Sequence, residues 1–256
     1  MARKRKQRKF NPSDDAFERY EPLREELREY VEVCEGLRFL RHPFCNVGIG
    51  DLNRCGWIHD SLDQRVAKYD ECFEAHDYEG CLKCIDICFQ PEWLEKDAEF
   101  LPDYRYWPLL RIAYENQKFT LHDRERFERM FRSKRPGREL LMSEQERAVL
   151  ARLPDRLHVY RGYSGEEMYG EGVAWTLDER QARWYANWQR TDDNPMLASG
   201  MIFKDRVWAY LDGGDILLPS EKVRMRRDVA AFDDAARKPW DEVMNPEFDV
   251  TSLLRS

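Results

Sequence analysis

The sequence predicts an α+β protein in which an N-terminal helical domain precedes a small β-rich domain. Apolar residues recur at helical spacing up to about residue 152, whereas short β-rich runs separated by turn residues follow Pro154. The chain has 256 residues and is 42% hydrophobic, which is enough for a sizeable core. We therefore divide it into a basic tail (1–12), a helical domain (13–152), a β-rich domain (153–227) and a C-terminal helix or arm (228–256).

The basic tail contrasts with an acidic remainder. Six cations occupy the first nine positions: Arg3, Lys4, Arg5, Lys6, Arg8 and Lys9. The net charge of the whole chain is −7, so the rest of the protein carries −13 without them. The tail is either a solvated, disordered terminus or a contact for nucleic acid or anionic lipid. The sequence shows no apolar run near the roughly 18 residues of a membrane span, which predicts a soluble, cytoplasmic protein without a membrane partner.

The helical domain is predicted from a series of periodic segments. The run "PLREELREYVEVCEGLRFL" (22–40) has helical spacing and Pro22 at a first turn, and "FCNVGIGDLNRCG" (44–56) has the composition of a loop. Ser143 and Glu146 have the spacing of a capping box. Further helices are expected at 61–77, 79–90, 92–99, 106–119 (with Pro108 in the first turn), 122–132 (capped near His122 or Asp123) and 143–153.

All seven cysteines lie in the first third of the chain. The spacing of Cys81, Cys84 and Cys88 places them on one face of a helix, which is typical of small thiols packed in a core. A second interpretation joins two i, i+4 pairs into a Cys₂His₂ zinc site, formed by Cys55, His59, Cys72 and His76. Core packing is favoured, and no metal site is assigned.

The β-rich domain is predicted from five short runs. They are "RLHVYRGYS" (156–164), "GVAWTL" (172–177), "MLASGMIFK" (196–204), "RVWAYL" (206–211) and "DILLP" (215–219). Between the second and third runs, Asp178 and Gln181 have the spacing of a capping box that opens another helix.

Three of these runs carry side chains suited to a nucleotide. Arg161 ends a strand beside Gly162, where a planar guanidinium can bind phosphate and a ligand can approach the backbone closely. Thr176 adds a hydroxyl, and Trp175 or Tyr185 adds a flat apolar wall. Asp215 follows a Gly-Gly turn, where its carboxylate can face a cleft. Each of these residues also has a structural explanation: strand surface, core or turn.

The segment "LHVYRGYS … GEGVAWTLDERQARWYANW … VWAYLDGGDILLP" resembles the ADP-ribosyltransferase fold of the arginine–serine–glutamate type. It is similar to phage and prophage members with Tyr-Arg-Gly, Ser-Trp-Thr and Glu-x-Glu blocks. The likeness covers residues 153 to about 225. It implies a phage-encoded protein of the host cytoplasm that binds NAD, with a host protein or nucleic acid as its further partner.

The resemblance also implies a role for each matching residue. Arg161 would bind the NAD phosphate and nicotinamide ribose. Ala174, Trp175 and Thr176 would shape the nicotinamide pocket. Asp215 would take the place of the catalytic glutamate, which stabilises the positive charge that develops as nicotinamide leaves.

Three departures from the family pattern leave two functions open. Ala174 replaces a serine, Asp215 is one methylene shorter than glutamate, and Gly213 lacks the side chain that selects the acceptor. The protein is expected either to cleave NAD and transfer ADP-ribose to a host macromolecule or to water, or to be a catalytically degenerate relative that acts as a binding or inhibitor protein.

Overall fold

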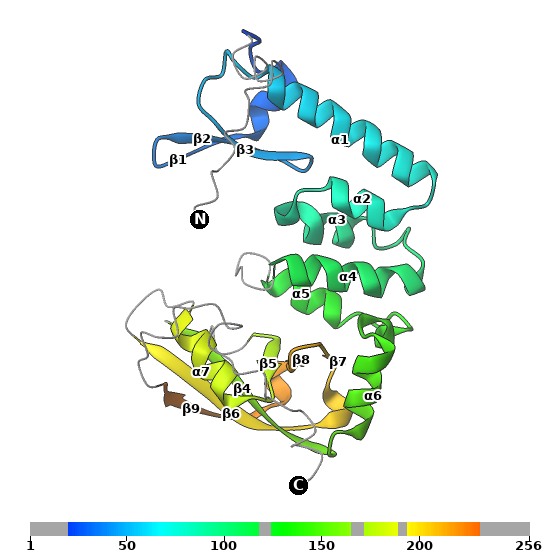
Figure 1. Ribbon diagram of the computed structural model, residues 1–256, viewed down its shortest axis with the longest axis vertical. Helices are drawn as coiled ribbons and strands as arrows, with labels where there is room; N and C mark the ends of the chain where they lie inside the picture. The colour runs from blue at the N-terminus through cyan, green and yellow to red at the C-terminus, as the bar shows by residue number, and fades with distance from the viewer. Residues whose placement is uncertain (1–19, 118–123, 165–171, 189–193, 231–256) are drawn as a thin grey trace, which may run out of the picture. The chain divides into compact units, whose positions relative to one another are not determined.

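The structure is a computed structural model that describes residues 20–117, 124–164, 172–188 and 194–230 (Figure 1). These residues form helices and antiparallel sheets, which confirms the mixed α and β class. The chain divides into two compact units: a first unit of residues 1–97 with 112–117, and a second unit of residues 98–111 with 118–256. The expected basic tail lies outside the described residues, as does nearly all of the expected C-terminal arm.

The first unit contains a three-stranded antiparallel sheet followed by helices. Its elements are η2 (Glu25–Tyr30), β1 (Val31–Cys34), β2 (Leu37–His42), β3 (Cys45–Ile49), α1 (Gly56–Glu74), α2 (Tyr78–Cys84), η3 (Ile87–Phe89) and α3 (Gln90–Lys96). The helix α4 (Asp103–Gln117) contributes residues to both units, and Pro108 lies inside it rather than in its first turn.

The helix predicted over residues 22–40 is wrong, because this segment forms η2 and then a β-hairpin of β1 and β2. The turn between the strands is Glu35-Gly36, whose φ angles of 52° and 82° are both in the left-handed region. Two such residues in succession build the turn that matches the twist of paired strands. The predicted loop 44–56 is likewise wrong in part, since β3 occupies its first residues and pairs with β2.

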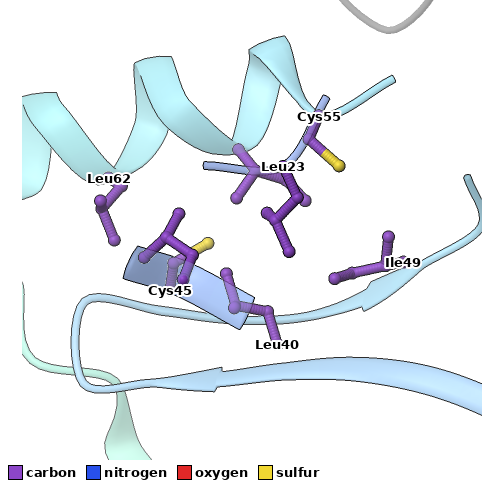
Figure 2. Packing of buried hydrophobic residues seen from close by; sticks show 8 residues of the cluster. Leu23, Leu40, Cys45, Ile49, Cys55 and Leu62 are labelled. Carbon is purple, nitrogen blue, oxygen red and sulfur yellow. The ribbon is translucent and has the colours of Figure 1, made fainter. Parts of the chain in front are cut away.

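The core of the first unit lies between this sheet and the start of α1 (Figure 2). Leu40 from β2 and Ile58 from α1 are completely buried there, and two of the cysteines are part of the same cluster. Its buried members are Leu23, Leu27, Leu40, Cys45, Ile49, Cys55, Ile58 and Leu62. The thiols therefore act as small apolar groups in this core.

The second unit combines helices with a six-stranded sheet. Its further elements are α5 (Arg124–Phe131), η4 (Arg138–Leu141), α6 (Glu144–Arg152), β4 (Arg156–Ser164), β5 (Ala174–Thr176), α7 (Glu179–Trp188), β6 (Pro195–Phe203), η6 (Lys204–Arg206), β7 (Ala209–Tyr210), β8 (Asp215–Leu217), η7 (Ser220–Lys222) and β9 (Arg224–Val229). Helices α5 and α6 thus belong to the same compact unit as the sheet, whereas the sequence grouped them with the N-terminal part.

The strand order in the large sheet is β7-β8-β5-β4-β6-β9, and every neighbouring pair is antiparallel. Each of the five predicted runs overlaps one of these strands. The sixth strand, β9, lies at the edge of the sheet and was not predicted. Its sequence "RMRRDV" is dominated by charge, which hid the strand from a search for apolar alternation.

Candidate functional site

The three strands that carry the predicted site lie side by side as β8, β5 and β4. Thr176 on β5 pairs with Asp215 on β8 and with Tyr160 on β4. Residues directly opposite one another in an antiparallel pair point to the same face of a sheet. Asp215, Thr176 and Tyr160 therefore form a row on one face, which is the face that α7 covers.

Thr176 is fixed by the start of α7. Its side chain is 2% exposed, and its hydroxyl donates to Oε1 of Gln181 at 2.5 Å. The Thr176 hydroxyl oxygen also accepts a hydrogen bond from the backbone N–H of Asp178 at 3.1 Å. Asp178 caps the start of α7 as predicted, because its carboxylate accepts from the N–H of Arg180 at 2.9 Å. The predicted capping box is wrong, because the Gln181 side chain and the Asp178 N–H both bind Thr176 instead.

Tyr185 on α7 interacts with Asp215. Burial raises the pKa of the Tyr185 phenol, the negative charge of Asp215 raises it further, and a hydrogen bond with Gln181 lowers it. The phenol is therefore buried close enough to the Asp215 carboxylate to be affected by its charge. Asp215 is 8% exposed, so its charge lies in a mostly desolvated place under α7.

Arg161 and Trp175 point to the opposite face of the sheet, by the alternation of side chains along β4 and β5. Nη1 of Arg161 donates to the carbonyl of Ala174 at 2.5 Å, and its guanidinium packs so closely on Gly172 that a Cβ there would collide with it. The indole Nε1 of Trp175 donates to the carbonyl of Gly172 at 2.8 Å. The structure thus brings these two residues together, away from the Asp215 row.

Gly162 lies under α7 rather than beside open space. A Cβ on Gly162 would collide with the backbone of Ala182 and Ala186. The close approach that the sequence predicted at this glycine is therefore made by the protein's own helix. The missing side chain lets α7 pack directly on β4, which corrects the interpretation of Gly162 as a contact for a ligand.

Glu146 has a structural role beyond the helix cap that its sequence spacing predicts. The capping box with Ser143 is confirmed. In addition, Arg111 binds both oxygens of the Glu146 carboxylate at 2.5 and 2.8 Å, and the N–H of Asp212 donates to Oε1 at 2.7 Å. Asp212 opens the turn that leads to Asp215, so this buried ion pair holds the turn in place.

The charge of Glu146 is maintained despite its burial. Burial alone would raise its pKa, but hydrogen bonds from Arg111, Ser143 and Asp212 lower the pKa to about 2. The turn that it holds contains Gly213 and Gly214, with φ angles of 86° and 88° that favour glycine. A Cβ on Gly213 would have no neighbour within 4 Å, so this position of the turn is open.

The structure does not bring the four residues of the alternative zinc site together. Cys55 precedes α1 and Cys72 lies near its end, which places them about 25 Å apart along the helix axis at 1.5 Å per residue. Both ring nitrogens of His59 have partners: Glu21 at 2.7 Å and the N–H of Arg24 at 3.2 Å. Among the described residues, no cluster of three or more potential metal ligands occurs.

The predicted helix 79–90 is divided, so its three cysteines do not share one helical face. Helix α2 ends at Cys84, and the Asp86 side chain then accepts from the N–H of Cys88 to start η3. Cys81 is fully buried and Cys84 nearly so, whereas Cys88 is exposed. Core packing is therefore confirmed for two of the three thiols.

No protein-family model, no curated protein and no solved structure matches this chain. Among the helices of the described segments, none combines the length and apolar character needed to cross a bilayer. The interpretation of the site therefore depends on the geometry and on the resemblance of its three sequence blocks.

Proposed function

We propose that the second unit is an ADP-ribosyltransferase-like domain that binds NAD and cleaves the bond between nicotinamide and ribose. ADP-ribose would pass to a host macromolecule or to water. The observation that carries the proposal is the pairing of Thr176 with Asp215 on adjacent strands. The second and third sequence blocks are thereby adjacent, and the first block lies on the next strand, β4.

The chain's own residues suit this reaction in part. NAD, when bound, supplies the scissile bond. Asp215 would stabilise the positive charge that develops on the ribose, and its desolvation strengthens that interaction. Tyr185 would donate a hydrogen bond and form a wall. Arg161, which the resemblance assigns to a phosphate, points to the opposite face of the sheet from Asp215, where it donates to the Ala174 carbonyl, so it does not contribute to the same site. Gly162 contributes no contact to a ligand, because α7 covers it.

The second candidate is a catalytically degenerate domain that acts by binding a host protein. One observation favours it: the Thr176 hydroxyl, the family's pocket-shaping group, is buried and bonded to Gln181 and Asp178. Ala174 and Gly213 also lack the side chains that the family uses. In this case the site residues would stabilise the fold by packing, and the protein would not cleave NAD.

Release of free nicotinamide from NAD over hours separates the two candidates. Wild-type protein and the control Asp70→Ala, which removes an exposed carboxylate on α1, should release nicotinamide at equal rates. Asp215→Ala should reduce release at least a hundredfold, since a 1 Å displacement of a reacting group alone costs about that factor. Asp215→Glu should be faster than wild type.

Two results would contradict the catalytic proposal. Equal release by wild type and Asp215→Ala would show that Asp215 takes no part. Absence of release from wild type, with all variants folded by circular dichroism, would favour the degenerate binding protein.

A further inference from the structure

The face of the sheet that α7 covers continues beyond that helix. Ala182 and Ala186 of α7 pack on Leu197 of β6. Further along the same strand, Met201 and Phe203 share this face and are 43% and 54% exposed. Strand pairing extends the surface sideways: Phe203 lies opposite Arg156, and Met201 lies between His158 and Arg224.

This end of the sheet face is hollowed into a groove of about 650 Å³. That volume is in the range of ligand sites, roughly 300–1,000 Å³. The described residues that line it include four cations and no carboxylate. We name it the basic groove, formed chiefly by Arg156, Met201, Phe203, Arg206, Lys222 and Arg224.

Two of the four cations of the basic groove, Arg156 and Arg224, have no ion-pair partner among the described residues, whereas Lys222 interacts electrostatically with the neighbouring Glu221. Arg206 lies 3.7 Å from Asp205, and both side chains are exposed. The whole protein has a net charge of −7, so the positive charge of this groove is a local feature. Such a groove is complementary to an anionic ligand.

The basic groove also offers flat surfaces. The Arg156 guanidinium lies over the Phe203 ring, with its carbon 5.2 Å from the ring centroid. Outside the groove lining, on the same strand β4, the rings of the exposed His158 and the half-buried Tyr160 lie 4.7 Å apart. Exposed aromatic rings and guanidinium planes are the surfaces on which unpaired bases stack.

We propose that the basic groove binds single-stranded nucleic acid. Phosphates would contact Arg206, Lys222 and Arg224, and a base would stack at Phe203 and Arg156. A single strand suits the groove because the bases of a duplex are stacked on one another and cannot reach Phe203. This proposal is independent of NAD cleavage.

The test measures fluorescence anisotropy of labelled twelve-nucleotide RNA and DNA strands with the full chain at 50 and 200 mM salt. All proteins carry glutamine in place of the six tail cations (residues 3–6, 8 and 9), so that the tail cannot contribute. Lys222→Ala and Arg224→Ala should each reduce the slope of log affinity against log salt by about 0.7. Phe203→Ala should weaken binding about fivefold or more without changing that slope.

Matched controls are Arg38→Ala, an exposed arginine on β2, and Phe100→Ala, an exposed phenylalanine outside the groove. Both should bind like the parent protein. The proposal is overturned if the parent protein binds neither strand, or if the groove variants bind as well as the controls. It is also overturned if a duplex or phosphatidylserine vesicles bind more tightly than the single strands. The RNA and DNA arms identify the preferred strand.

Discussion

At the scale of single residues, Gly162 decides how closely α7 approaches the sheet. Gly162→Ala adds a methyl group where the backbone of α7 lies, so overpacking should lower the free energy of unfolding by about 1–3 kcal/mol. Gly50→Ala is the control, because a Cβ there has no neighbour within 4 Å. Urea unfolding midpoints of the two variants measure the difference. Equal midpoints would show that α7 moves away at no cost.

Glu146 is a second single residue with a large expected effect, here on the stability of the fold at low pH. Its folded pKa of about 2 lies below its usual value, so its carboxylate stabilises the fold above roughly pH 4.5, and this contribution is lost as the pH falls towards 2. Glu146→Gln should lower the free energy of unfolding at pH 7 by on the order of 3 kcal/mol, since it removes the carboxylate charge that binds the Arg111 guanidinium. It should also flatten the decline between pH 5 and 2.

Glu144→Gln is the matched control for that pH profile, because it neutralises an exposed glutamate in the same helix. Urea titrations at several pH values give the comparison. If Glu146→Gln and Glu144→Gln have the same profile as wild type, the ion pair with Arg111 does not hold the turn before Asp215.

At the scale of elements, the hydroxyl of Thr176 ties β5 to the start of α7. Thr176→Val keeps the shape but leaves the Asp178 N–H without its acceptor and Gln181 without its donor, at a cost of about 1–3 kcal/mol. Thr176→Ser keeps the hydroxyl and should retain most of the stability. Thermal unfolding followed by circular dichroism distinguishes them, and equal losses in both variants would assign the effect to the methyl group instead.

The turn between β1 and β2 contains two residues with left-handed φ angles, Glu35 and Gly36. Substitutions at these two positions should therefore change the stability of the first unit in opposite directions. Glu35→Asn should stabilise the first unit by about 0.5 kcal/mol, because asparagine tolerates positive φ. Gly36→Ala should destabilise it by about 1 kcal/mol through the backbone alone, since its Cβ would meet nothing within 4 Å. Amide hydrogen exchange in β1 and β2 measures both changes in stability. A change in the same direction in both variants would contradict the proposed turn conformation.

At the scale of the whole molecule, the reactivity of the cysteines measures the opening of the first unit only. All seven lie in the first unit, none forms a disulfide, and only Cys34 and Cys88 are exposed. A thiol reagent such as Ellman's should therefore find two fast groups in the native protein and seven in denaturant. Burial raises the pKa of Cys81 to about 11, which slows its reaction further. Cys34→Ser should leave one fast group, and more than two in wild type would show that the first unit opens readily.

The sequence by itself determined the features that depend on neighbours along the chain. The runs that became β4 and β6 and the capping box of Ser143 and Glu146 were predicted, because strand alternation and cap chemistry are local. The hairpin at Glu35-Gly36 was missed, because glutamate at positive φ gives no clear turn signal and the flanking apolar residues also fit a helix.

Only the tertiary structure decided which residues meet. Strand pairing placed Thr176 opposite Asp215 and placed Arg161 on the other face of the sheet. It also brought Arg111 to Glu146, and Glu146 to Asp212, across 35 and 66 residues of sequence. Such contacts depend on the register of the strands and on the docking of the helices. In a strand, a shift of one residue moves every side chain to the other face of the sheet. No local sequence pattern therefore predicts which of these residues meet.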